Sequence, residues 1–287
     1  MWMGTLFALI AGMMWGLVFV GPLLLPEYSA ALLSAGRYLA FGLIALPLAW
    51  FDRARLRQLG REDWLEALKL SAVGNLLYYL CLASAIRRDG SLPWARLLPS
   101  LGLIAAGIGC VNQAELHALE AAGEPDWGRY ASGALLAMVA VACWTWYPLR
   151  NADWLRDHPG RSPRTWATAQ GLVTLPMALL GYALLWLGMA LTGSDFAMPL
   201  GPRPEHFVAL MVTIALLSSW VGTLCWNEAS QRLPTSIAGQ LIVFETLAAL
   251  GYAFLLRGQW PAPLTLAGIA LLIVGVLWAV RVRPVRD

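Results

Sequence analysis

Apolar residues fill long stretches of this chain, and short polar stretches separate them. Nine apolar segments are visible, at residues 3–23, 30–50, 64–86, 97–113, 131–149, 165–191, 205–229, 234–256 and 262–281. A helix needs about 20 mostly apolar residues to cross the hydrocarbon core of a bilayer. The segments are too long for barrel strands and lack their alternation. The pattern predicts an all-α integral membrane protein.

The composition supports this fold class. Hydrophobic residues make up 59% of the chain and charged residues only 13%, about half the charged share of an ordinary soluble domain. The net charge of +3 comes from arginines between the apolar segments, where such residues set membrane topology. We therefore expect no nucleic-acid partner. The cysteines lack metal-type spacing, and we expect neither a metal nor a cofactor.

The two halves of the chain resemble each other. Residues 4–15, GTLFALIAGMMW, match residues 133–144, GALLAMVAVACW, at Gly, Leu, Ala, Ala and Trp. The last segment of each half also begins at a proline after a short polar turn, in SLPWARLLPSLG and in QWPAPLTLAG. We predict a first repeat at residues 1–114, an outer linker at 115–130 and a second repeat at 131–287.

The first repeat lacks one crossing. The second repeat has a complete segment at 234–256, whereas the first runs directly from Ile86 to Arg87. With nine crossings, the eighteen arginines in loops or at segment ends divide seven against eleven between the two sides of the membrane. A tenth crossing between Ile86 and Arg87 makes the division fifteen against three. The positive-inside rule expects such a bias. We therefore infer a tenth helix there and two inverted five-helix repeats, with both termini cytoplasmic. A deletion and an omission from the sequence both fit, and we prefer omission.

Several motifs resemble a known family. They are the Gly-to-Trp helices that open each repeat, Arg37 in SAGRYLAFGLIAL, and the closing pair of segments in SIAGQLIVFETLAALGYAFLLRGQWPAPLTLAGIALLIVGVLWA at 236–279. Over residues 4–281 the chain resembles the EamA-type ten-helix carriers of the drug/metabolite transporter superfamily. Its aromatic-rich helices, with CVNQAEL and VFETLAAL, are most similar to the YddG-type aromatic amino-acid exporters. The resemblance implies a secondary transporter that exports aromatic and other neutral hydrophobic amino acids across the bacterial inner membrane by alternating access.

Polar and aromatic residues inside the segments are candidates for the transport site. Counting the helical rise puts Trp15 roughly 16 Å from the inner face and Trp144 roughly 20 Å from the outer face, both near the midplane. Asn75 shares a helical face with Tyr78 and Tyr79. Such residues supply donors, acceptors and an apolar slot for a zwitterionic amino acid, but packing between helices explains them as well. The candidate substrate-binding residues are Trp15, Asn75, Tyr78, Tyr79, Trp144, Ser219, Trp220, Gln240, Phe244 and Glu245.

Three ionisable residues are of interest because they are embedded in the predicted helix bundle. Arg37 is about 10 Å from the outer end of its helix, Glu245 lies just beyond the middle of its segment, and Glu228 is at the inner edge. Charges at membrane depth are candidates for function. Glu245 either binds a substrate ammonium or carries a proton, and Arg37 either holds a carboxylate or pairs with an acid. We assign Arg37 and Glu228 to gating or a charge pair, and a role in the fold alone stays open.

Other functions were weighed. The same fold suits the export of another small metabolite or drug, and a channel or a lipid flippase is an alternative of a different class. A membrane-embedded enzyme is disfavoured, because His117, His158 and His206 lie in loops or at a segment edge, so no catalytic residues are assigned. The expected partners are a small-molecule substrate and the lipid bilayer. The sequence is compatible with a monomer and leaves the oligomeric state open.

Overall fold

The computed structural model describes residues 2–75, 146–234, 237–238, 241–258 and 261–281, with a few helical positions between 102 and 113. Every regular element in these ranges is helical, as predicted. Four helical stretches are long and apolar enough to cross a membrane: Trp2–Leu24, Ala30–Phe51, Pro163–Leu191 and Pro204–Arg232. Their bounds agree with the predicted segments to within three residues. The inferred tenth crossing, much of three predicted segments and the loop around Arg88 lie outside the described residues.

The first crossing contains a local irregularity near its end. It consists of α1 (Trp2–Gly16), the 3₁₀ turn η1 (Leu17–Val20) and α2 (Gly21–Leu24). Pro22 has no backbone N–H, so the carbonyl of Val18 cannot receive the usual bond from four residues ahead. The N–H of Gly21 bonds that carbonyl instead, which is the tighter 3₁₀ pattern. The proline therefore accounts for the change of helix type.

The second crossing is followed by a reversal of the chain. Ser29 caps α3 (Ala30–Phe51), and its hydroxyl accepts a bond from the N–H of Leu32 at 3.2 Å. The short α4 (Arg53–Leu56) follows, and α5 (Arg61–Asn75) then runs back. Its first turn carries Glu62 and Asp63, which favour a helix N-terminus.

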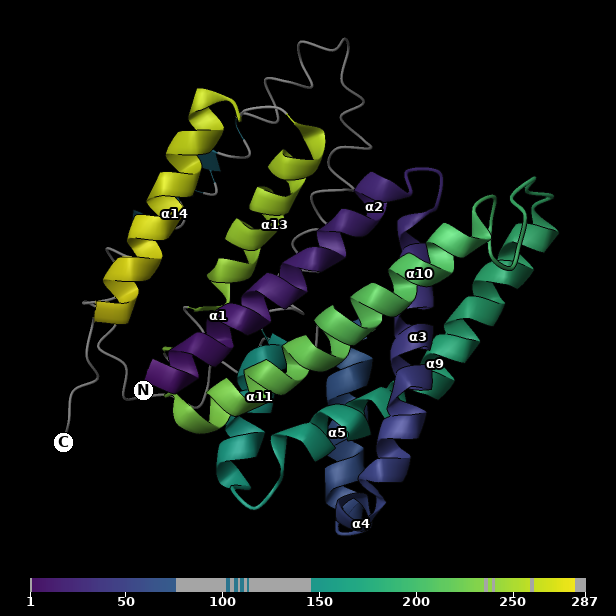
Figure 1. The fold of residues 1–287 in the computed structure, drawn as a ribbon, viewed down its shortest axis with the longest axis horizontal. Helices are drawn as coiled ribbons and strands as arrows, with labels where there is room; N and C mark the ends of the chain where they lie inside the picture. The colour runs from purple at the N-terminus through teal and green to yellow at the C-terminus, as the bar shows by residue number, and fades with distance from the viewer. Residues whose placement is uncertain are drawn as a thin grey trace.

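The long α9 (Pro163–Leu191) packs antiparallel along α3 (Figure 1). A Cβ atom built on Gly42 of α3 would lie 2.6 Å from Cβ of Leu175, and one built on Gly171 of α9 would lie 2.7 Å from Cβ of Ala45. Small residues let membrane helices approach this closely. Thr165, near the start of α9, donates to Asp52, just past the end of α3. The second crossing of the first predicted repeat and that of the second predicted repeat therefore run in opposite directions.

The stretch from 204 to 232 changes helix type in its middle. It comprises α10 (Pro204–Ile214), the π-helical segment η2 (Ala215–Gly222) and α11 (Thr223–Arg232). A π-helical turn inside a longer helix is rare and often occurs at a functional site.

Of the last two described helices, the first packs against the first crossing and the second lies beyond it (Figure 1). They are α13 (Val243–Arg257) and α14 (Pro263–Arg281). A Cβ atom on Gly16 of α1 would lie 2.9 Å from the backbone N of Ala249, so α13 packs closely on α1. Figure 1 shows the start of α1 and the end of α14 at the same end of the bundle.

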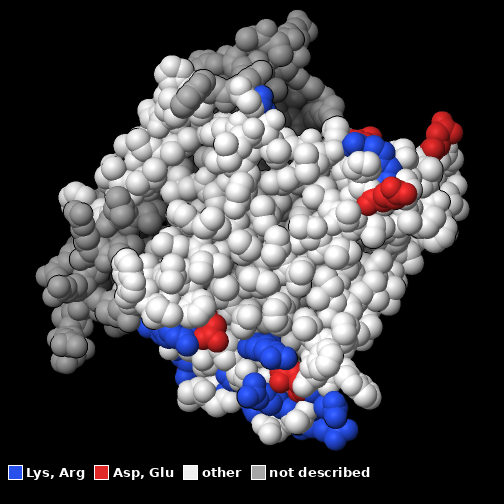
Figure 2. Space-filling view, in the orientation of Figure 1, with Lys and Arg blue, Asp and Glu red and all other residues white. Residues whose placement is uncertain are grey.

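Charged residues leave a broad apolar band free. On the face shown in Figure 2, Lys and Arg gather near α4 and the start of α9, fewer charges lie at the opposite end, and the surface between is uncharged. Apolar side chains of α9 such as Leu180, Leu184 and Leu191 are exposed. Lipid tails cover such a band. We call the end near α4 the basic end.

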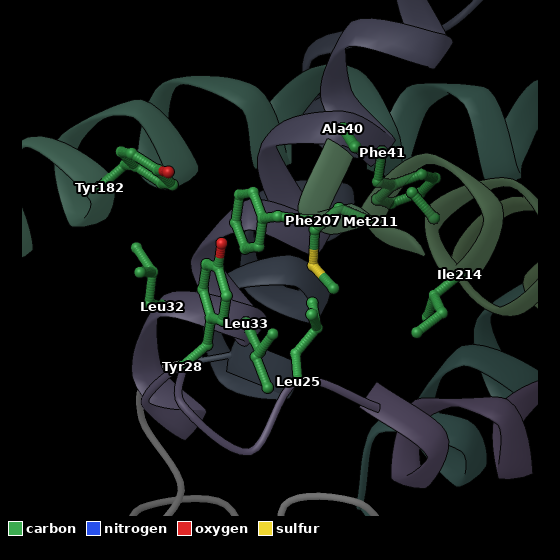
Figure 3. Packing of buried hydrophobic residues seen from close by; sticks show 11 residues of the cluster. Leu25, Tyr28, Leu32, Leu33, Ala40, Phe41, Tyr182, Phe207, Met211 and Ile214 are labelled. Atoms are coloured by element: carbon green, nitrogen blue, oxygen red, sulfur yellow. The ribbon is translucent and has the colours of Figure 1, made fainter. Parts of the chain in front are cut away.

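The end opposite the basic end has its own apolar core. The rings of Tyr28 and Phe207 stack with centroids 4.9 Å apart, and Met211 packs beside them (Figure 3). The Tyr28 hydroxyl donates to the carbonyl of Leu200 at 2.8 Å and accepts from the N–H of Arg203 at 2.9 Å. These bonds attach the turn before α10 to the turn before α3.

Candidate functional site: a polar pocket between the two halves

A polar pocket lies in the middle of the helix bundle. Its described lining residues come from α1, α3 and α5 in the first half, and from residues 146–157, α9, η2 and α11 in the second: Trp15, Arg37, Tyr38, Phe41, Leu70, Ser71, Tyr147, Gln170, Thr174, Ser218, Ser219 and Thr223. Arg37 lies seven residues after the start of α3, and Gln170 seven residues after the start of the oppositely directed α9. Each is therefore about 10 Å from its own end, at a depth within the membrane.

One side of the pocket is held by a buried network of amides. Tyr147 donates to Oε1 of Gln170 at 2.5 Å, and Nε2 of Gln170 donates to Oδ1 of Asn151 at 3.0 Å. Asn151 also accepts from Nε1 of Trp166 and donates to Asn227, with both bonds at 2.7 Å. Because amide groups buried in a bundle need partners, this network fixes the position of Gln170. The polar side-chain atoms of this network already bond one another, so the network has a structural role.

Other lining residues of the pocket carry buried polar atoms that have no hydrogen-bond partner among the described residues. Ser218 is fully buried and Ser219 is 7% exposed. Neither Oγ atom has a hydrogen-bond partner in the described part of the structure, and the same holds for Nε of Arg37. The Arg37 guanidinium lies 4.2 Å from the ring centroid of Tyr38, a cation–π contact. These three side chains are the groups in the pocket that are available to bind a ligand.

The free space in the pocket is small. It amounts to about 50 Å³. A water molecule needs about 10–15 Å³ of such space, so the pocket holds a few waters or a carboxylate group. An aromatic ring does not fit in this conformation. The pocket therefore has to widen before it accepts a whole aromatic amino acid.

The structure brings three of the predicted residues into the pocket. Trp15 is 2% exposed, and its ring lies 5.3 Å from that of Trp226 while also lining the pocket. Ser219 and Arg37 line it too. Arg37 has no ion pair among the described residues.

Other predicted residues lie elsewhere. Trp220 packs against the core of Figure 3, and its Nε1 donates to Thr168 at 3.3 Å. Phe244 and Glu245 lie against Gly12 of α1, and Glu245 is 7% exposed. Glu228 pairs with Arg232 one turn along α11. Tyr78, Tyr79, Trp144 and Gln240 lie outside the described residues, as does the side chain of Asn75.

Sequence reasoning missed several lining residues. It did not select Tyr38, Phe41, Ser71, Tyr147, Gln170, Thr174, Ser218 or Thr223. A usable signal was present for two of them. Gln170 and Thr174 are polar, lie four residues apart and therefore share one face of an otherwise apolar segment. The aromatic lining residues gave no such signal among so many aromatic residues.

Ion pairs connect the two halves at the basic end. Arg161 makes a two-point contact with Asp63, with Nε to Oδ1 at 3.0 Å and Nη2 to Oδ2 at 2.6 Å. Arg150 bonds Glu66 at 2.6 Å. The side chains of Asp63 and Glu66 are only 4% and 5% exposed, so water screens these pairs weakly. Both pairs join α5 to the second half.

A further ion pair connects the halves at the opposite end. Nε of Arg203 donates to Glu27 at 2.5 Å, and its Nη2 donates to the carbonyl of Leu24 at 2.8 Å. The hydrogen bond from Arg203 lowers the pKa of the Glu27 carboxyl below its usual value. Ion pairs between the halves are therefore present at both ends of the bundle. Within the described ranges, no group of three or more His, Cys, Asp or Glu side chains is placed to hold a metal ion.

The chain is similar in sequence to known membrane proteins. Residues 2–91 match the EamA-like transporter family. Over 310 aligned positions the chain is 55% identical to the inner membrane protein YtfF of Escherichia coli (strain K12), covering 98% of this chain and 96% of that protein. The name places that relative in the inner membrane, which agrees with the predicted location.

The alignment with this relative is longer than the chain. Because 98% of 287 residues is about 281, the relative has residues at about 29 of the 310 positions where this chain has none. With this identity over nearly the full length of both proteins, the family is clear. The chain is a membrane transporter, not an enzyme, and belongs to the EamA-like transporter family.

Proposed function

We propose that the chain exports aromatic and other neutral apolar amino acids by alternating access, with the pocket between the halves as the binding site. The observation that carries this proposal is that the lining residues of the pocket come from both halves of the chain. Residues of both halves meet at membrane depth around polar groups that lack partners within the described part. Buried polar groups at that depth mark substrate pathways in transporters.

The chemistry of the lining suits an amino acid with an aromatic side chain. The rings of Trp15, Tyr38, Phe41 and Tyr147 line the pocket. Such rings stack on an aromatic substrate, and their faces attract an ammonium group. The serine hydroxyls accept or donate hydrogen bonds to the charged ends of the substrate. The combination favours an amino acid over a purely apolar compound.

The contacts at the two ends of the bundle suggest how access alternates. Opening toward the basic end requires the pairs Asp63–Arg161 and Glu66–Arg150 to separate, and opening toward the other end requires Glu27 and Arg203 to separate. The arginine-rich end is cytoplasmic by the positive-inside rule. Rocking of the halves would break one set of pairs at a time and widen the small pocket.

The pair at the far end should respond to acid. Because the folded-state pKa of Glu27 is lowered, the pair stabilises the protein above the usual glutamate pKa, and this stabilisation is lost as the pH falls through the folded value. We expect Glu27→Gln to lower the melting temperature at pH 7 and to have no effect well below pH 4. Thermal unfolding of the purified protein from pH 3 to 7 measures this difference. The exposed Asp195→Asn is the control, and an equal effect of Glu27→Gln at every pH would contradict the expectation.

The longer relative supports a ten-helix plan. About 29 extra positions are enough for one crossing, which needs about 20 residues. We propose that these positions correspond to the tenth helix inferred between Ile86 and Arg87. Sequencing the genomic coding region between these two codons tests this idea of an omitted helix. An uninterrupted reading of Ile86 followed by Arg87 would mean that the protein works with nine crossings.

Counterflow in vesicles tests the proposed function. Purified protein is reconstituted into proteoliposomes loaded with unlabelled phenylalanine, and labelled phenylalanine is added outside. We expect transient accumulation of label that saturates with concentration, and none in protein-free vesicles. Absence of counterflow for phenylalanine, tyrosine and tryptophan would refute the substrate assignment.

The same vesicles separate the alternatives. A transporter of another metabolite or drug would show exchange only with that compound. A channel would give flux that does not saturate, and a flippase would move labelled lipid between leaflets. Each of these outcomes counts against amino-acid export.

A further inference from the structure

Unpartnered polar atoms are concentrated in the pocket. The described part of the structure has four buried side-chain nitrogen or oxygen atoms without a hydrogen-bond partner, and three of them, on Arg37, Ser218 and Ser219, line this one pocket. Buried polar groups in proteins are nearly always satisfied, so such a cluster calls for a missing partner. The fourth, on Trp154, is not among the residues that line the pocket.

The two serines differ from two other buried hydroxyl residues of the described helices, Thr174 and Ser230. A serine or threonine within a helix commonly bonds the carbonyl four residues earlier. Thr174 does so at 2.7 Å, and Ser230 does so at 2.7 Å. Ser218 and Ser219 lie in the π-helical η2 and make no such bond. Both hydroxyls are therefore free to donate into the pocket.

The described lining of the pocket carries a positive charge. Among the described lining residues, Arg37 alone carries a formal charge. A guanidinium at membrane depth is costly without an anionic partner. The remaining space of about 50 Å³ matches a small anionic group. Gln170 does not compete for it, because its amide is engaged by Tyr147 and Asn151.

These observations converge on the head group of the substrate. Building on the proposed function, we infer that Arg37, Ser218 and Ser219 form a subsite for the substrate carboxylate. The guanidinium supplies the charge, and the two hydroxyls supply further hydrogen bonds to the same oxygens. The transporter therefore selects compounds that carry a carboxylate and discriminates against their neutral amides. The aromatic side chain of the substrate occupies space that opens when the halves move.

Two probes of the same shape test this subsite. The probes are 3-phenylpropionate and its neutral amide, and their binding to purified protein in nanodiscs is measured by isothermal titration calorimetry. We expect the wild type to prefer the carboxylate by about tenfold or more, as for hydrogen bonds to a charged group. Arg37→Gln should reduce this ratio to near one, while Arg37→Lys keeps part of it. The exposed Arg257→Gln is the matched control and should keep the full preference.

A second pair of variants guards against misfolding of the arginine mutants. Ser218→Ala and Ser219→Ala remove one donor each and should lower the affinity for the carboxylate several-fold with little change for the amide. The inference is overturned if the wild type binds both probes equally or neither, or if Arg37→Gln keeps the preference. Because the probes are not amino acids, a carboxylate preference without phenylalanine counterflow would refute the export proposal and retain the subsite. Phenylalanine counterflow together with an unchanged carboxylate preference in Arg37→Gln would retain the export proposal and refute the subsite.

Discussion

Replacing Gly42 by alanine is expected to destabilise the protein by about 2–3 kcal/mol, the upper part of the range of about 1–3 kcal/mol for adding a group to a well-packed core. The added Cβ atom would lie 2.6 Å from Cβ and 2.8 Å from the backbone Cα of Leu175. Since a backbone atom cannot move aside as a flexible side chain can, α3 and α9 have to separate. Gly171→Ala is expected to act in the same direction, because its Cβ would lie 2.7 Å from Ala45. Thermal unfolding of the purified protein measures the loss.

Gly181→Ala on the same helix provides the control. In the described part of the structure, a Cβ atom there would have no neighbour within 4 Å apart from the adjoining residues and backbone of its own helix. Alanine also favours a helix over glycine by up to about 1 kcal/mol. We therefore expect this variant to be as stable as the wild type or slightly more stable. Equal melting temperatures for Gly42→Ala and Gly181→Ala would contradict the close packing of α3 on α9.

Removing the carboxylate of Asp63 is expected to cost about 2–4 kcal/mol. Loss of one partner of a buried ion pair typically costs about 3–5 kcal/mol, and Arg161 is 30% exposed, which lets water compensate in part. Asp63 also accepts a bond from the N–H of Gly60 at 2.7 Å, so it holds the start of α5 as well. Asp63→Asn and Arg161→Gln, alone and together, measure the coupling by their unfolding midpoints.

The double variant distinguishes a true pair from two independent residues. If the two side chains stabilise the basic end together, the double variant should be little worse than Asp63→Asn alone. Arg164→Gln, an exposed charge near the start of the same helix, should have little effect. If the losses of stability in the two single variants simply add in the double variant, the Asp63–Arg161 pair does not help to close the basic end.

The membrane crossings were predictable because the bilayer imposes them. Every backbone group in lipid needs an internal partner, so apolar runs of the right length must be helical. The predicted segments at 30–50 and 165–191 therefore agree closely with Ala30–Phe51 and Pro163–Leu191. Counting residues from a helix end selected Arg37 and Trp15 as candidates, and both line the pocket.

Rotation about each helix axis was harder to predict. Neighbouring residues in a helix point about 100° apart, so Ser219 faces the pocket while Trp220 packs against the core at the far end. The π-helical turn at 215–222 changes this rotation in a way that periodicity does not reveal. Phe244 and Glu245 illustrate the same limit, because their helix presents them to α1. The face of a helix that lines the pocket depends on which helices pack against it, and the sequence does not show these neighbours.

The most direct test of the account asks whether the pocket opens to both sides of the membrane. Ser219→Cys, in a variant whose four native cysteines are replaced by alanine, places one thiol in the pocket wall. A membrane-impermeant thiol reagent is applied to vesicles either outside or from within. The account predicts labelling from each side in turn and protection by phenylalanine. No labelling from one or both sides, or labelling that phenylalanine does not slow, would contradict it.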